Sequence, residues 1–156
     1  MNELNIGKRF RLLCPEGFRE MSEQERGALN MMGQGDTLCL TNEEGHMVVS
    51  MGWKDVNAVS AFLLRIFRPI TSVEASVNQA MAPYGYRKET GLMRQIGGQE
   101  AQGFRFTYTA GVPMVGESYV IREGRSLTFF HVYVRAAQRS EGLEQWNRLL
   151  DAVEPL

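Results

Sequence analysis

The sequence predicts an α+β fold, an α/β/α sandwich in which a central antiparallel sheet lies between helices. Four consecutive strand-like segments fill residues 84–136 and are separated by short turns that contain glycine. The last two segments, residues 118–121 and 127–134, are apolar on both faces, so both faces need a cover. Amphipathic helical segments before and after the four strands can supply that cover.

The composition is that of an ordinary globular protein. The chain has 156 residues, 44% hydrophobic and 22% charged, with a net charge of −1. This length fits a single domain over residues 1–156. Without a basic excess the chain lacks the electrostatic footprint of a nucleic-acid binder. It has no signal peptide and no run of ~18 apolar residues, so we expect a cytoplasmic protein that does not interact with membranes.

The first third predicts a strand, a short helix and a hairpin. Residues 8–14 form the strand, and the capping box of Ser22 and Glu25 starts a helix that reaches about residue 32. Residues 37–41 and 46–53 form the hairpin. Strict alternation in its second strand predicts one buried face, made of Met47, Val49, Met51 and Trp53.

Two helices follow the hairpin. Asn57 can cap the first, and Pro69 is expected to stop it at residue 68. Its apolar residues recur at helical spacing and predict a buried stripe of Val59, Phe62, Leu63, Ile66 and Phe67. A second capping box, Thr71 to Glu74, is expected to start the next helix, with Val73, Val77, Ala80 and Met81 facing the core.

The four strands can be given a register if every turn is assumed to contain two residues. One row across the sheet then contains Glu89, Phe106, Glu117 and Phe130, and a bulge or a longer loop would change it. The chain ends in a helix that begins at Ser140. Its apolar stripe is expected to pack on the sheet and contains Leu143, Trp146, Leu149, Leu150 and Val153.

The order of elements and three short phrases resemble one known family. The phrases are FRLLCPEGF at 10–18, QGFRFTYTA at 102–110 and LEQWNRLLDAVEP at 143–155. Together they resemble the PsbP-like family, which includes the photosystem II accessory protein PsbP, Mog-type regulators of the Ran GTPase, and bacterial lipoproteins and adaptors. The resemblance implies an α/β/α sandwich, a bacterial source and a non-catalytic role. It carries over no binding site, because no site motif matches residue by residue.

A pair of carboxylates offers the one enzymatic alternative. In the assumed register Glu89 and Glu117 share a face, two strands and about 9–10 Å apart. Beside aromatic rings they could act as acid and base in a small hydrolase or isomerase. Arg87 or Arg105 could instead simply pair with a carboxylate. His131 and Glu117 point to opposite faces in this register, so we interpret His131 as a histidine hydrogen-bonded within a packed layer.

The remaining candidates concern binding. Met31 and Met32 stand beside a glycine-rich loop and are candidates for an exposed contact patch, since methionine adapts to varied partners. Cys14 and Cys39 lack metal-ligand spacing and are interpreted as small buried thiols, with a bridge possible if their strands are adjacent. We therefore expect a non-enzymatic protein-binding or adaptor module without cofactor or metal, whose partner is another protein or a second copy.

Overall fold

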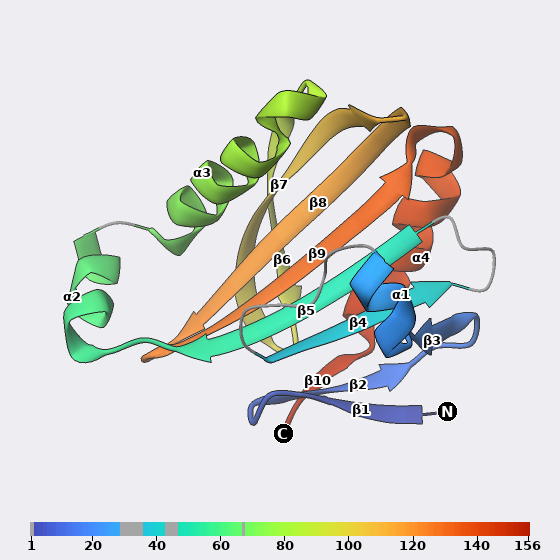
Figure 1. Ribbon diagram of the computed structural model, residues 1–156. Coiled ribbons are helices and arrows are strands. Elements are labelled where there is room, and N and C mark those ends of the chain that lie inside the picture. The colour runs from blue at the N-terminus through green and yellow to red at the C-terminus, as the bar shows by residue number, and fades with distance from the viewer. Residues whose placement is uncertain (1, 29–35, 43–46, 67) are drawn as a thin grey trace.

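The computed structural model describes residues 2–28, 36–42, 47–66 and 68–156 (Figure 1). The strands within these residues are β1 (Asn2–Ile6), β2 (Phe10–Cys14), β3 (Phe18–Glu20), β4 (Asp36–Asn42), β5 (Met47–Asp55), β6 (Arg87–Ile96), β7 (Gln99–Ala110), β8 (Val112–Glu123), β9 (Ser126–Arg135) and β10 (Val153–Pro155). The α-helices are α1 (Glu23–Ala28), α2 (Ala58–Ile66), α3 (Pro69–Met81) and α4 (Arg139–Asp151). Two 3-10 turns, η1 (Ala82–Tyr84) and η2 (Ala136–Gln138), complete the described elements.

The large sheet has seven strands in the order β3-β4-β5-β9-β8-β7-β6 within the described residues, and every neighbouring pair is antiparallel. The predicted four-strand segment is β6 to β9, and the predicted hairpin is β4 with β5. The two parts join because β5 pairs with β9 along its whole length. The predicted fold class, an antiparallel sheet between helices, is confirmed.

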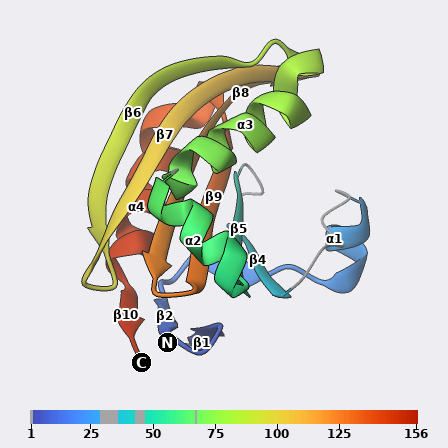
Figure 2. The same ribbon diagram turned by 90° about the vertical axis from the view of Figure 1, so that its left-hand side faces the viewer.

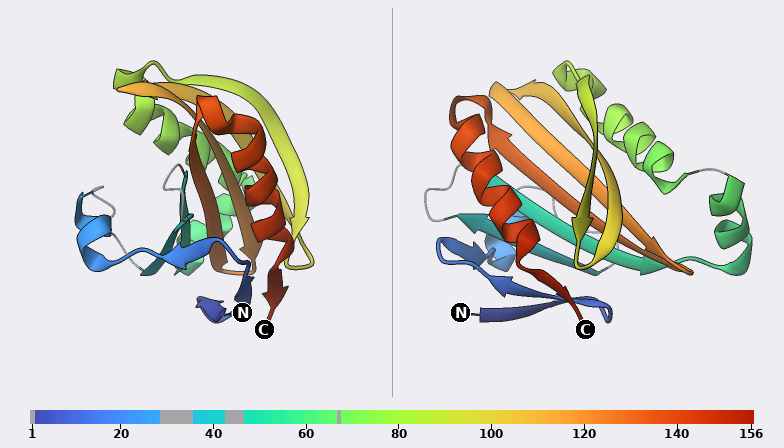
Figure 3. Two further views of the ribbon diagram at one scale, coloured as in Figure 1. Left: turned by 90° about the vertical axis from the view of Figure 1, so that its right-hand side faces the viewer. Right: turned by 180° about the vertical axis from the view of Figure 1, so that it is seen from behind.

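Each face of the sheet has its own cover. The face that bears Phe104, Ser118 and His131 carries α2 and α3, which follow one another along it (Figure 2); we call it the α3 face. The opposite face, which bears Glu117 and Val132, carries α4 (Figure 3); we call it the α4 face. A small sheet of three strands, in the order β1-β2-β10, packs beside α4.

The core of the α4 face follows the predicted alternation. Met47, Val49 and Met51 of β5 are fully buried there, and Trp146 of α4 packs into the same cluster with no exposed surface. The prediction was wrong about Val153, which lies in β10 and pairs with Leu12 instead of continuing the helix. Apolar spacing alone could not separate the last helical residue from a buried strand residue that follows it.

The assumed register of the four strands was wrong in three places, one of them between β8 and β9, where Glu117 pairs with Val132 and not with Phe130. Gly111 alone forms the turn between β7 and β8, so Ala110 pairs with Val112 and the register moves by one residue. A shift of one residue reverses which face each side chain occupies. Glu117 therefore lies opposite Arg105 and not opposite Phe106.

A second irregularity lies in β6. The register shifts between Lys88 and Thr90, which leaves Glu89 in a bulge while Phe106 pairs with Lys88. The two-residue Gly97-Gly98 turn between β6 and β7 was predicted correctly, and both glycines have the positive φ that such turns require.

Two of the three predicted helix caps are confirmed, and the last helix begins at Arg139, one residue before the predicted Ser140. Ser22 Oγ accepts from the Glu25 amide at 3.2 Å while Glu25 Oε1 accepts from the Ser22 amide at 3.1 Å. Asn57 Oδ1 accepts from the Ser60 amide at 2.8 Å. The capping box proposed at Thr71 was wrong, because α3 already begins at Pro69. Proline is well suited to the first turn of a helix, where its missing N–H costs no hydrogen bond.

Both cysteines are free and buried, as interpreted from their surroundings. Burial raises the pKa of the Cys14 thiol.

Met31 and Met32, the proposed contact residues, lie outside the described residues. None of the helices in the described parts of the chain is long and apolar enough to cross a lipid bilayer.

Candidate functional site

The α3 helix covers only part of its face of the sheet. Its buried Val73 packs, together with Val77 and Met81, on an aromatic cluster from β7 that includes Phe104 and Phe106. The helix contacts β7 and β8, and the next strand, β9, lies beyond its edge in the ribbon view (Figure 1). The side chains of β9 that face this side are therefore not fully covered by α3.

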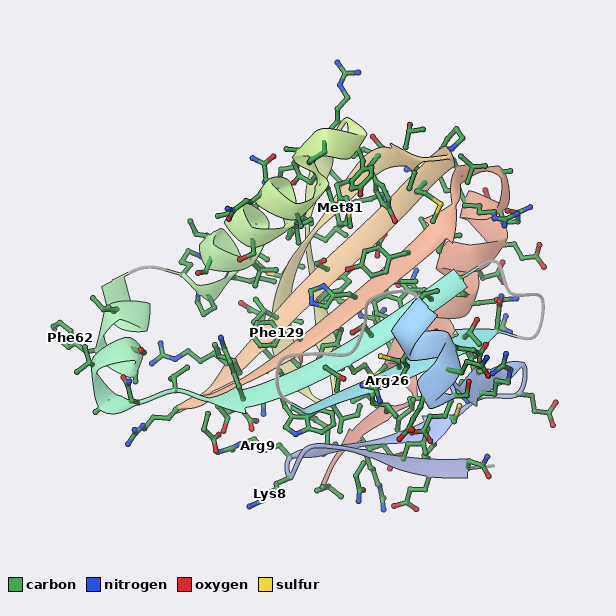
Figure 4. All side chains as sticks on the ribbon, viewed as in Figure 1. Lys8, Arg9, Arg26, Phe62, Met81 and Phe129 are labelled. Atoms are coloured by element: carbon green, nitrogen blue, oxygen red, sulfur yellow. The ribbon has the colours of Figure 1, made fainter. Side chains whose placement is uncertain are left out.

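These β9 side chains form the floor of a groove. The groove has a volume of about 770 Å³, with walls from α2 and α3. Its floor is made by Leu127, Phe129, His131 and Tyr133. Phe129 lies on the sheet between α3 and β5 (Figure 4). This volume is within the range of about 300–1,000 Å³ found for ligand pockets.

The α2 helix exposes the apolar stripe that the sequence predicted to be buried. Val59 is 69% exposed, Phe62 59% and Leu63 47%. Leu63 lines the groove, while Phe62 points away from the body of the protein (Figure 4). The side chains of residues 66 and 67, predicted to extend the stripe, are outside the description. The periodicity identified an apolar stripe correctly, but periodicity does not state what covers a stripe.

His131 supplies a polar but uncharged group at the floor. It lies opposite Ser118 in the sheet, and its Nδ1 is 2.7 Å from the Ser118 hydroxyl oxygen. Burial lowers the pKa of His131 to about 4, so the ring is neutral at neutral pH. This agrees with its interpretation as a hydrogen-bonded histidine of a packed layer. The prediction that His131 and Glu117 face opposite sides is also confirmed, since Glu117 pairs with Val132.

The charged side chains that line the groove are both cations. Lys54, near the end of β5, places its Nζ 5.6 Å from the centre of the Phe129 ring, a cation–π distance. Arg68 precedes the first turn of α3. Neither forms an ion pair with a carboxylate among the described residues. The groove is thus an apolar concavity with positive charge and no described acidic side chain in its lining.

The predicted carboxylate pair lies on the opposite side of the sheet from this groove. Glu117 is 1% exposed, accepts from Arg105 Nε at 2.7 Å, and accepts from the Trp146 indole at 3.1 Å. Glu89 pairs with Arg139 of α4 and lies 3.4 Å from Arg105 Nη1. Arg105 therefore pairs with both carboxylates. An arginine that pairs with a carboxylate is the alternative to catalysis given in the sequence analysis.

The surroundings of Glu89 do not prepare it to donate a proton. Its hydrogen bonds to Arg139, with a smaller contribution from Arg105, hold its pKa below the usual value. A general acid at neutral pH needs the opposite shift. The cluster of Glu89, Arg105, Glu117, Arg139 and Trp146 is suited to fixing α4 on the sheet.

Comparison with known proteins shows the fold. No model of a protein family matches the sequence, and no curated protein matches it. Solved structures do match. Cyanobacterial PsbP from Synechocystis sp. PCC 6803 has a TM-score of 0.69 at 11% identity, over 98% of this chain and 90% of that one. LpqN of Mycobacterium tuberculosis, involved in cell envelope biogenesis, has a TM-score of 0.58 at 11% identity, over 94% and 82%.

An alanine mutant of the protein Mog1 matches over 99% of this chain and 96% of its own, with a TM-score of 0.57 at 10% identity. The chain has the PsbP-like fold. The fold resemblance inferred from three short phrases is confirmed, although identities this low carry no residue of those proteins over to this one.

Within this PsbP-like fold, no sequence pattern directly indicated the groove. Its floor residues belong to β9. Because this strand is apolar on both faces, the sequence predicts a complete helical cover for each face. The offset of α3 toward β7 and β8 leaves part of that face open. A weak signal existed in His131, an imidazole within the mostly apolar run of β9.

Proposed function

We propose that the protein is a non-enzymatic protein-binding module whose binding surface is the groove together with the exposed stripe of α2. The observation that carries this proposal is the exposure of Val59, Phe62 and Leu63 on one side of a helix beside the groove. Contiguous exposed apolar surface is typical of interaction sites. A binding role also agrees with the non-catalytic role implied by the PsbP-like resemblance.

The arrangement favours binding over catalysis for a physical reason. The groove holds a neutral histidine and two cations but no described carboxylate, and the hydroxyl that pairs with His131 belongs to Ser118, which has no exposed surface. The hydrolase or isomerase alternative rests on Glu89 and Glu117, and both are engaged by arginines on the α4 face. We therefore place the binding proposal first.

The test compares two exposed apolar residues. Tagged wild-type protein, Phe62→Ser and Met93→Ser are used to recover partners from an extract of the source cells, and bound proteins are quantified by mass spectrometry. Met93 is a matched control because it is 63% exposed and lies on β6, outside the lining of the groove. We expect a partner that is retained by wild type and Met93→Ser and lost by Phe62→Ser.

The stability of the variants separates loss of binding from loss of fold. Since Phe62 is exposed, Phe62→Ser should change the free energy of unfolding by no more than about 0.5 kcal/mol. A partner that Phe62→Ser still recovers would contradict the proposed surface. Turnover of a small molecule that is lost in both Glu89→Gln and Glu117→Gln would favour the enzymatic alternative. A second copy as the partner would appear as a dimer by light scattering that Phe62→Ser dissociates.

A further inference from the structure

The groove has a charge bias that restricts its occupant. Both charged side chains in its lining, Lys54 and Arg68, are cations. They lie at the same end, because β5 leads into α2 just after Lys54 and α3 begins just after Arg68 (Figure 1). Two more arginines flank α2: Arg125 Nε donates to the Val56 carbonyl at 2.9 Å, and Arg122 Nη2 to the Ala61 carbonyl at 3.4 Å.

The acidic side chains near this end are already engaged. Asp55 accepts from the Ser126 hydroxyl at 2.5 Å, Glu123 pairs with Arg9 at 2.9 Å, and Glu74 of α3 pairs with Lys88. The lining cations have no carboxylate partner among the described residues. A cation beside an apolar surface forms its strongest ion pair with an anion that belongs to an apolar partner. The apolar part of the partner excludes water from the ion pair.

We propose that the groove binds an apolar helical segment of a partner protein that carries carboxylates at one end, with those carboxylates against Lys54 and Arg68. This rests on the proposed binding function and adds the chemistry of the partner. The apolar side chains of the segment pack on Phe129, Leu63 and the exposed stripe of α2. The acidic end fixes the direction in which the segment lies.

The shape of the site favours a protein segment over a bilayer or a single lipid. The floor residues lie in a concavity, which a flat bilayer surface does not enter. Val59 and Phe62 belong to the same exposed stripe of α2 as Leu63, which lines the groove, and a ligand held inside the cavity would leave both exposed. A helix laid along a groove can contact both regions through side chains three and four residues apart.

The test uses three fluorescent peptides with one alanine–leucine helix, ending in two glutamates, two glutamines or two lysines. Anisotropy titrations with the full chain should rank the glutamate peptide tightest and the lysine peptide weakest, with at least a tenfold difference between them. Added salt should narrow this difference, since screening weakens exposed charge pairs. Combined Lys54→Glu and Arg68→Glu should reverse the ranking.

The control has the same change in charge at a distance from the groove. Arg87→Glu on β6 combined with Arg148→Glu on α4 alters two exposed cations and should keep the wild-type ranking. If all three peptides bind equally and Phe62→Ser abolishes binding, the charge inference is wrong while the proposed function stands. If the glutamate peptide binds wild type and Phe62→Ser alike, or does not bind, both are contradicted. Binding to phosphatidylglycerol vesicles without any preference among the peptides would overturn the inference in favour of a membrane.

Discussion

Two neighbouring residues of the central strands show how position decides the state of a titratable group. His131 and Glu117 belong to adjacent strands but face opposite sides of the sheet. His131 has a hydroxyl as partner and burial lowers its pKa to about 4, so it is kept neutral. Glu117 is more deeply buried, yet it has an arginine and an indole as donors. Burial favours the neutral form of the imidazole, whereas the arginine and the indole satisfy the buried carboxylate oxygens of Glu117 with hydrogen bonds.

Acid should destabilise the protein through His131 before the carboxylates titrate. The folded pKa of about 4 lies below the ordinary histidine pKa of 6.5. Between these pKa values the unfolded chain binds the proton and the folded chain does not, so the free energy of unfolding falls as pH is lowered from 6.5 toward 4. We expect a loss on the order of 2 kcal/mol, reduced from the full shift because the ring is partly exposed.

The measurement is urea unfolding of wild type and His131→Asn at several pH values between 7 and 4.5. The wild type should lose stability over this range and the variant should lose less. NMR titration of the His131 ring checks the pKa directly. Equal pH slopes for the two proteins, or a ring that titrates near 6.5, would show that the imidazole is not desolvated as described.

Trp146 should be the largest single contributor on α4. It has no exposed surface and its indole donates to Glu117. Trp146→Ala leaves a cavity and removes the donor, and we expect a loss of ~3–5 kcal/mol in urea unfolding. Trp146→Phe restores most of the volume without the donor and should cost about 1–3 kcal/mol. An unfolding midpoint unchanged in Trp146→Ala would contradict the packing of α4 on the sheet.

At the scale of elements, α2 and α3 have similar apolar stripes and different surroundings. Val73 of α3 packs on Phe104 and Phe106 of β7 and is buried. Val59 and Phe62 of α2 have no such layer, because α2 is attached near the turn between β8 and β9 through backbone carbonyls that accept from arginines. The stripe of α3 therefore contributes to folding, whereas that of α2 stays exposed.

Strand β8 contains a glycine whose missing side chain lets an aromatic ring lie flat against the backbone. A Cβ built on Gly116 would be 2.3 Å from Cζ of Phe106. Gly116→Ala must displace that ring and should cost about 1–3 kcal/mol in urea unfolding. Gly91→Ala on β6 is the control, since nothing lies within 4 Å of its Cβ position, and it should stay within about 0.5 kcal/mol. Equal effects at both positions would show that Phe106 does not depend on Gly116.

For the whole molecule, the sequence predicted the sheet and its sandwich because alternation and two-sided apolar strands are local patterns. The turn at Gly111 and the bulge at Glu89 each differ from the assumed turns by one residue, which local propensity does not specify. The small sheet was missed because β1 carries mostly polar residues and β2 pairs with strands from both ends of the chain. The groove could not be predicted, since it results from where α3 lies over the sheet.

Two packed layers share the central strands, and this should determine how stability is distributed. The clusters on the α3 and α4 faces both take side chains from β8 and β9, so opening either strand disrupts both clusters. Amides that exchange only through such opening should be the most protected. We expect the slowest hydrogen exchange in β5, β8 and β9, and faster exchange in α2 and in β6 at the edge of the sheet.

Hydrogen exchange read by mass spectrometry tests this distribution, with and without the glutamate-ended peptide. The peptide should slow exchange in α2 and in the first turns of α3, while β8 and β9 stay unchanged because they are already protected. Protection of α2 equal to that of β9 in the free protein would mean that α2 is packed as firmly as the central sheet. Its exposed stripe would then be part of a rigid body and not a surface that gains order from a partner.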